Sequence, residues 1–349
     1  MYKKFFMGIA AMAALTLVSC SSDDLNSLSD NSSKNEAISF DGYLGRSAVA
    51  VNGTRGSVLE IGDLKKSKDG FGVFGNYNAT GGQNFGSNLF NNQPVAYKTS
   101  AWTYSPLRYW PTEGHIDFLA YAPYDVNTAL NTTLEEKMTS CINFTVENTV
   151  TKQKDLLWAN AENQTKANNS GTKKVEFTFN HALAKIGYSL KQKEAYDKTT
   201  ITVTSIKLVG SDTKGAFYSK GTIDLSKENN NKDLWTIGEN VEKQNFDWFT
   251  GSAELTTTAA NNATDNDLFV IPQNFSETAT DKLFVVVEYT VQTDGTAALK
   301  NKVTKPITAN FLQGKAYTIN LTIGLTPIEF DATVDTWENG ITISEIPMD

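Results

Sequence analysis

The chain has 349 residues, of which 40% are hydrophobic and 20% are charged, and its formal net charge is -8. This length suits two folded domains of roughly 150 residues each. The negative charge and the lack of a dense cluster of Lys and Arg argue against a nucleic-acid-binding surface. We therefore expect a folded chain with long polar connections and no nucleic acid among its partners.

The N-terminal segment has the pattern of an export signal. Lys3 and Lys4 precede an apolar stretch, Phe5 to Val18, that is short for a bilayer span. The segment ends in Leu-Val-Ser-Cys, which resembles the lipobox whose cysteine is acylated and becomes the mature N-terminus. This predicts a lipoprotein signal peptide over residues 1–19 and lipidation at Cys20. The Ser-Ser-Asp-Asp that follows resembles the signal that sends lipoproteins of Bacteroidetes-type bacteria to the outer face of the outer membrane.

The segment after the predicted lipid site, residues 20–36, is polar and is expected to be a flexible tether. The chain has two cysteines, and lipidation of Cys20 leaves Cys141 without a cysteine partner. No intramolecular disulfide is therefore expected. Cys141 lies in an apolar run with no neighbouring base that would activate a catalytic thiol. We interpret it as a small buried strand residue.

From Ala37 onward, apolar and polar residues alternate in many short stretches, which predicts β-strands with one buried face. In residues 201–210 the apolar phase changes between Val203 and Ile206, and this predicts a β-bulge. After the signal segment, only residues 132–141 suggest a short helix. The clearest strands are predicted at 38–44, 175–180, 283–291 and 317–325.

Short strands separated by Gly, Asn, Asp and Pro clusters favour an all-β fold of antiparallel β-sandwiches. We expect two such domains in tandem, over residues 37–180 and 181–349, with the boundary near Asn180. Residues 76–95 and 160–174 are rich in Asn and Gly and are expected to be long exposed loops.

Motifs for catalysis and metal binding are missing from the sequence. His115 and His181 stand beside apolar strands without the carboxylate spacing of a metal site, and we expect them to bond to backbone groups. Asp265 and Asp267 are interpreted as solvated turn residues. The chain has no nucleophile-elbow, zinc-protease, P-loop or dinucleotide motif. We therefore expect no enzymatic activity, no metal and no cofactor.

Four aromatic residues are concentrated in one stretch: Trp102, Tyr104, Tyr109 and Trp110. Aromatic faces suit sugar rings, so these residues are a candidate ligand surface. Aromatic residues in paired strands more often fill a core or stack across strands, and this is the favoured interpretation.

Several stretches, taken in order, resemble the fimbrillin family, the subunits of the type V pili of Bacteroidetes-type bacteria. The resemblance implies two transthyretin-like β-sandwich domains and no enzymatic activity. The matching stretches cover nearly all of the mature chain and lie at 38–40, 70–75, 108–124, 152–160, 177–190, 268–275, 314–330 and 334–340.

The resemblance also implies a route of assembly. Family members are exported as lipoproteins, and an Arg-specific surface protease cuts after an arginine near the first strand. Loss of that strand and of the lipid opens an apolar groove, which a neighbouring subunit fills with a strand of its own, taken in the family's stalk subunits from the C-terminus. The contact is head-to-tail and yields a filament. The implied partners are other fimbrillin subunits, the protease, and the outer membrane through the lipid of the pro-form.

Two of the three arginines, Arg46 and Arg55, lie in one short stretch of small residues, although the chain otherwise uses lysine. The Gly-Thr-Arg-Gly around Arg55 best matches the family's cleavage pattern, and Arg46 is the alternative. Small residues keep such a bond accessible to a protease.

The segments at the two ends of the mature chain have the pattern of exchangeable strands. Ile38, Phe40 and Leu44 alternate with polar residues and form the candidate detachable strand. The candidate donor strand contains Ile341, Ile343 and Ile346, with an ordinary final strand as the open alternative.

Two functions from different classes follow. The first is a fimbrial subunit that supports cell adhesion, located at the outer membrane and then in the fimbrium, with its role as stalk, tip or anchor open. The alternative is an outer-surface lipoprotein that binds glycans or host ligands through the aromatic stretch.

Overall fold

The structure is a computed structural model of the chain. It describes residues 36–44, 61–66, 69–131, 139–171, 173–211, 215–228, 233–262, 266–325 and 329–335. The signal peptide, most of the tether and most of the predicted helix at 132–141 lie outside these ranges. The chain divides into Met1–Glu36 and Ala37–Asp349, and all the elements below belong to the second unit.

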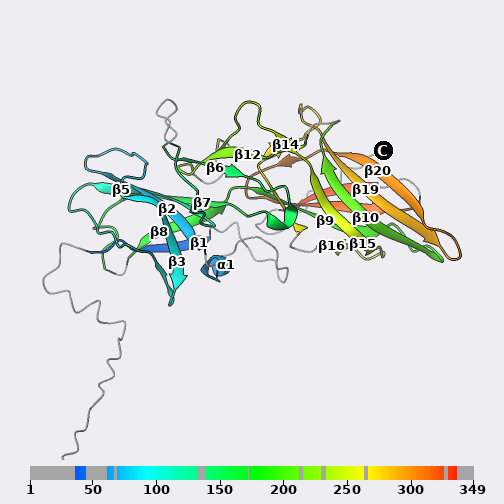
Figure 1. The fold of residues 1–349 in the computed structure, drawn as a ribbon, viewed down its shortest axis with the longest axis horizontal. Helices are drawn as coiled ribbons and strands as arrows, with labels where there is room; N and C mark the ends of the chain where they lie inside the picture. Colours follow the sequence, from blue (N-terminus) through cyan, green and yellow to red (C-terminus); the bar gives the residue numbers. More distant parts are fainter. Residues whose placement is uncertain are drawn as a thin grey trace, which may run out of the picture. The chain divides into compact units, whose positions relative to one another are not determined.

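The regular secondary structure of the described residues is almost entirely β-strand, which confirms the predicted all-β class (Figure 1). The exceptions are one short helix, α1 (Ile61–Lys66), and one 3-10 turn, η2 (Val150–Lys152). Neither was predicted. Among these residues there is no apolar helix of the length that a membrane crossing requires.

The first half of the unit forms a seven-stranded sheet in the order β1-β8-β7-β5-β2-β3-β4. Side chains alternate across it, so Phe71 and Phe118 face one hydrophobic cluster while Phe74 and Leu119 face another. The strands are β1 (Phe40–Leu44), β2 (Phe71–Asn78), β3 (Phe90–Lys98), β4 (Ala101–Thr103), β5 (His115–Ala122), β7 (Leu157–Gln164) and β8 (Val175–His181).

The remaining strands form smaller sheets. The larger of these have the orders β15-β10-β19-β20, β16-β9-β22-β23 and β13-β12-β6, while β17 pairs with β9, β11 with β14, and β18 with β21. The strands are β6 (Cys141–Thr145), β9 (Ala184–Gln192), β10 (Thr199–Val209), β11 (Phe217–Tyr218), β12 (Lys220–Asp224), β13 (Trp235–Thr236), β14 (Lys243–Gln244), β15 (Phe246–Glu254), β16 (Ala260–Asn261), β17 (Leu268–Val270), β18 (Gln273–Asn274), β19 (Leu283–Thr293), β20 (Leu299–Ile307), β21 (Asn310–Phe311), β22 (Ala316–Ile323) and β23 (Glu329–Asp335).

Most strand pairs are antiparallel, as predicted, but β1 pairs with β8 and β9 pairs with β22 in parallel. In both cases a long stretch of chain separates the two strands, which a parallel pair requires because the second strand must start from the same end. The mixed pairing could not be read from local patterns.

Several local predictions are confirmed. The alternating faces of β8 and β22 have the predicted buried residues, and β10 changes register with both neighbours between Val203 and Ser205. Cys141 is buried in β6.

The two predicted long loops are shorter than expected, because β2 ends at Asn78, β3 begins at Phe90 and β7 extends to Gln164. These strands carry Asn, Gln or Pro at half-buried and exposed positions, which hides the strand pattern.

The strand β6 connects the two halves of the sequence. It precedes residue 180 but pairs with β12, which follows it, over five positions from Cys141 opposite Asp224 to Thr145 opposite Lys220. The β8 to β9 connection passes from one hydrophobic cluster to the other, since Phe179 belongs to one and Ala182 to the other. The domain boundary near Asn180 stays a prediction.

Candidate functional site

The candidate detachable strand consists of β1, which is an edge strand of the seven-stranded sheet (Figure 1), and of residues 37–39 directly before it. On one side it pairs in parallel with β8, with Phe40 opposite Val175. On the other side the Ile38 N–H donates a hydrogen bond to the Arg108 carbonyl at 2.8 Å. Ala37 and Tyr109 form an isolated bridge beside this bond. The segment therefore has hydrogen-bonded neighbours on both edges.

The inner face of β1 is buried among aromatic side chains. Ile38 and Phe40 are each 1% exposed, and Leu44 is half-buried. The Phe40 ring lies 5.4 to 5.7 Å, centroid to centroid, from four rings. Burial of one such side chain stabilises a fold by roughly 1.5–3 kcal/mol. Removal of β1 would therefore uncover an apolar groove, whose walls include Phe90, Tyr104, Phe118 and Phe177.

The backbone of β1 is held by groups that do not depend on its side chains. The Tyr104 hydroxyl donates to the Ile38 carbonyl at 2.8 Å and accepts the Arg108 N–H at 3.2 Å. The Val175 N–H donates to the Ser39 carbonyl at 2.9 Å. Burial raises the pKa of Tyr104, which keeps its hydroxyl protonated as a donor.

The outer face of β1 is polar and open to solvent. Asp41 lies 3.9 Å from Lys174, and Tyr43 is 47% exposed. The neighbouring Asp41 carboxylate raises the pKa of the Tyr43 phenol. An exposed ion pair of this kind contributes about 0–1 kcal/mol, so the inner face supplies most of the stabilisation.

The structure separates the four aromatic residues of the predicted ligand surface. Trp102 and Trp110 are buried, and the Trp102 ring packs on Phe71 at 4.8 Å. Tyr104 belongs to the wall of the β1 groove. Tyr109 is 51% exposed. Of the four, therefore, Tyr109 alone offers a largely exposed ring.

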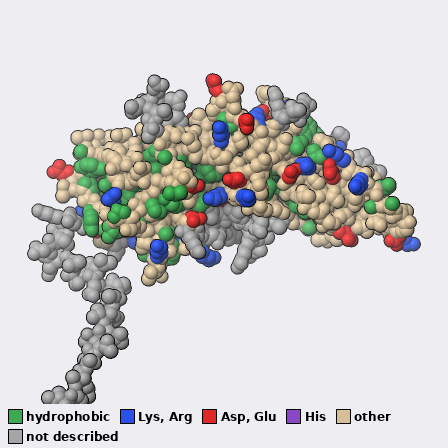
Figure 2. Space-filling model, in the orientation of Figure 1, with side chains coloured by type: hydrophobic (Ala, Val, Ile, Leu, Met, Phe, Trp, Pro, Cys, Tyr) green, Lys and Arg blue, Asp and Glu red, His purple; other side chains and the backbone are tan. Residues whose placement is uncertain are grey.

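Tyr109 borders an open pocket of about 330 Å³ together with Tyr77, Asn88, Leu89 and Pro111. The Asn88 side chain is engaged there by the backbone of Tyr77, through bonds of 2.6 and 3.0 Å. Figure 2 shows hydrophobic side chains at the surface of the part of the chain that forms the seven-stranded sheet.

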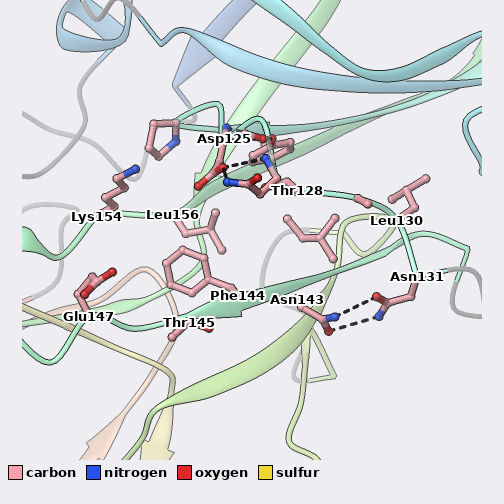
Figure 3. Close-up of a pocket in the computed structure, with 15 residues that line it drawn as sticks. Asp125, Thr128, Leu130, Asn131, Asn143, Phe144, Thr145, Glu147, Lys154 and Leu156 are labelled. Carbon is pink, nitrogen blue, oxygen red and sulfur yellow. Dashed lines mark hydrogen bonds between the residues drawn. The ribbon is translucent and has the colours of Figure 1, made fainter.

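A second cavity, of about 410 Å³, lies between the segment after β5 and strand β6. Figure 3 shows Asp125 and Thr128 on one side and Phe144 and Thr145 on the other. Its lining combines polar side chains with the apolar side chains of Leu130, Ile142 and Leu156. The amides of Asn131 and Asn143 at its rim bond to each other at 3.2 and 3.5 Å.

Both histidines face carboxylates, which corrects the expectation of backbone partners. His115 Nε2 lies 3.4 Å from Asp117, and His181 Nδ1 lies 2.8 Å from the buried Asp155. In the described ranges, no three His, Cys, Asp or Glu side chains come together as metal ligands.

The expectation for Asp267 was wrong. It is 5% exposed and its carboxylate binds Lys185 at 3.1 Å and Asn262 at 2.8 Å, because the chain around it packs against β9. Asp265 lies outside the described residues. So do the lipidation site Cys20, the two candidate cleavage residues Arg46 and Arg55, and the candidate donor residues Ile341, Ile343 and Ile346.

The buried Asp117 was missed by the sequence analysis. Its carboxylate accepts the backbone N–H groups of Asn84 at 3.0 Å and Asn163 at 2.8 Å, and the side-chain amide of Asn78 at 2.9 Å. A carboxylate within an apolar strand, near two Asn-rich segments, is the sequence signal that points to such a network.

The fold of the described strands is that of solved fimbrial β-sandwich proteins. The chain shares its fold with a fimbrial protein from Bacteroides vulgatus, with a TM-score of 0.62 and 21% identity over 86% of this chain and 99% of that one. The family model described as fimbrillin-like matches residues 54–337. The chain belongs to this family.

A curated relative is similar over part of its length. The fimbrium subunit Fim1C of Phocaeicola vulgatus is 29% identical over 224 residues, which cover 57% of this chain and 55% of that protein. The chain thus matches little more than half of this relative.

Proposed function

We propose that this chain is a structural fimbrial subunit, exported as a lipoprotein and matured by an Arg-specific protease. Cleavage after Arg55, or alternatively Arg46, separates β1 from the rest of the fold. An extended strand of a neighbouring subunit then takes the place of β1 in a head-to-tail contact. The chain carries out no catalysis in this role, and its partners are other fimbrillin subunits, the protease, and the outer membrane before cleavage.

The observation that carries the proposal is the position of β1. Its inner face fills an aromatic groove, yet it is joined in sequence only to the predicted tether before it and to the arginine-containing stretch after it. One cut after an arginine therefore leaves β1 held by non-covalent contacts alone. A vacated groove with unpaired backbone groups is a template for strand addition.

The test uses the purified full chain with Cys20→Ser and Arg108→Lys, so that Arg46 and Arg55 remain as Arg sites. An Arg-specific protease should give a new N-terminus at Gly56 and a ladder of oligomers. Arg55→Lys should prevent this cut, and Arg46→Lys should not. A trimmed chain that stays monomeric would overturn strand exchange, whereas an N-terminus at Ser47 would change only the assigned arginine.

A second candidate function is glycan binding, favoured by the pocket between Tyr77 and Tyr109. Binding to a panel of glycans should be lost in Tyr109→Ala and kept in Tyr43→Ala, which removes a similarly exposed ring elsewhere. Trp110→Ala is unsuitable because Trp110 is 4% exposed and its loss would disturb the core. No glycan affinity in the unchanged chain would exclude this function.

A further inference from the structure

We propose that the β1 groove selects the strand it holds by its depth at successive positions. It accepts large apolar side chains at the places of Ile38 and Phe40 and rejects any side chain much larger than a methyl or hydroxymethyl group at the place of Gly42. This selection rests on the strand exchange proposed above and assigns the residues that decide which strand enters.

The groove is shallow at Gly42 because two rings fill the space beneath it. Gly42 is buried and lies opposite Phe177 in the β1–β8 pair. A Cβ atom at this position would lie 3.3 Å from Cε2 of Phe179 and 3.7 Å from Cε1 of Phe71. These two rings pack against each other with centroids 5.3 Å apart, so neither moves aside freely.

A glycine is needed at position 42 because there is little room for a side chain, and not because of its backbone conformation. Gly42 is not among the residues with a positive φ, so any residue type is compatible with its backbone. Two positions earlier, the same face of the strand carries Phe40, with four rings around it and 1% exposure. The groove therefore changes from deep to shallow within two residues.

The backbone contacts fix the register in which a strand meets this change in depth. Tyr104 and Arg108 bind the carbonyl and the N–H of Ile38, and these bonds form with any residue that has a free backbone. A slip of two residues would press the Phe40 ring onto Phe71 and Phe179. Main-chain hydrogen bonds thus hold a strand of any sequence, whereas the limited space at the Gly42 position selects strands with a small residue there.

The groove requires two apolar residues followed by a small one at alternate positions. The segment that follows β23, residues 336–349, has this pattern in one direction only. Read in the direction of β1, no placement gives two apolar residues followed by a small one at alternate positions. Read in the opposite direction, Met348, Ile346 and Ser344 take the places of Ile38, Phe40 and Gly42. We therefore place the candidate donor strand of a second copy in the groove antiparallel to β8, with Ile346 inside and with Ile341 and Ile343 on the outer face.

The test measures peptide binding to the full chain after Arg-specific cleavage in the Cys20→Ser, Arg108→Lys background. A labelled peptide of residues 36–46 should enter the groove, and its Gly42→Leu form should bind at least tenfold more weakly. Ser39→Leu, the matched change on the outer face, should stay within twofold. Equal binding of the Gly42→Leu and unchanged peptides would overturn the selection.

The same assay tests the second occupant. A peptide of residues 340–349 should bind, with at least a tenfold loss for Ser344→Leu and little change for Glu345→Leu, which falls on the outer face. If the unchanged 340–349 peptide does not bind, or if Ser344→Leu and Glu345→Leu weaken its binding equally, the assignment of this segment is wrong. The result for Gly42 would still stand. If not even the unchanged 36–46 peptide enters the cleaved chain, the strand exchange itself fails.

Two further measurements separate selection from general loss of fit. Phe179→Leu in the cleaved chain should restore most of the binding of the Gly42→Leu peptide, because it deepens the floor where the added side chain lies. In the uncut chain, Gly42→Leu should lower the unfolding midpoint more than Ser39→Leu does. Equal unfolding midpoints for the two uncut variants would contradict the proposal, and this measurement does not depend on strand exchange.

Discussion

Cys141 is a core residue whose thiol is strongly held in its neutral form. It is 5% exposed in β6, and Asp224 lies directly opposite it on β12. Burial and, to a lesser extent, the Asp224 charge raise the pKa of the thiol to about 11. Such a thiol is unreactive at neutral pH, which agrees with the structural role predicted from the sequence.

This raised pKa predicts a loss of stability in alkali. Below pH 9 the thiol is neutral in both states, whereas between pH 9 and about 11 the unfolded chain ionises first and is favoured. The free energy of unfolding should fall across this range by up to roughly 2–3 kcal/mol. Urea unfolding at pH 8 to 11 checks this.

Cys141→Ala is the control for that titration. Its own unfolding free energy should fall less steeply with pH, although buried tyrosines such as Tyr188, with a pKa of about 12, contribute in both chains. Parallel pH profiles for the two chains would show that the thiol does not carry the effect.

Among the secondary-structure elements, Asp117 on β5 holds two neighbouring segments in place through hydrogen bonds. It lies where the register of β5 and β7 shifts, between Ile116 and Phe118, and it is 1% exposed. Its two backbone donors, Asn84 and Asn163, belong to the connection after β2 and to the end of β7. One carboxylate thus fixes two segments that are far apart in sequence.

Asp117→Asn should destabilise the fold by roughly 2–4 kcal/mol, because the amide cannot accept all of these bonds and leaves buried N–H groups unpaired. Hydrogen exchange should become faster at Asn84 and Asn163 in the same variant. Asp125→Asn is the matched control, since Asp125 is exposed and its carboxylate accepts hydrogen bonds from the backbone and side-chain amides of Asn127. Unchanged exchange at both amides would argue against the proposed tie.

At the scale of the whole molecule, a subunit that assembles by strand addition must keep its other sheet edges inactive. The strand β20 is the edge of the β15-β10-β19-β20 sheet, and it carries the exposed residues Lys300 and Lys302 together with Pro306. Charged residues and proline on an edge strand prevent pairing with another chain. In the assembly that we propose, this keeps the β20 edge from competing with the β1 groove.

Replacing these lysines should allow a second mode of association. Lys300→Thr with Lys302→Thr leaves β20 able to pair but removes the repulsion, so light scattering should show oligomers of the uncut chain as its concentration rises. Lys152→Thr with Lys154→Thr makes the same change in charge outside any strand and should leave the chain monomeric. Oligomers in both double variants would point to net charge and not to the edge.

Much of the local structure could be predicted from the amino-acid sequence. The buried faces of β8 and β22, the bulge in β10 and the buried Cys141 all follow from alternation over a few residues, because a strand shows its two faces locally. The same alternation identified Ile38 and Phe40 as an apolar face. The order of motifs along the chain pointed to the fimbrillin family.

The residues against which those faces pack could be found only in the folded structure. The groove around β1 is built from Phe90, Phe118 and Phe177, which are distant from one another in sequence, and its parallel pairing with β8 has no local signal. The shallow floor under Gly42 likewise depends on rings from two other strands. Packing between distant segments sets these features, whereas periodicity reports only which side of a strand is apolar.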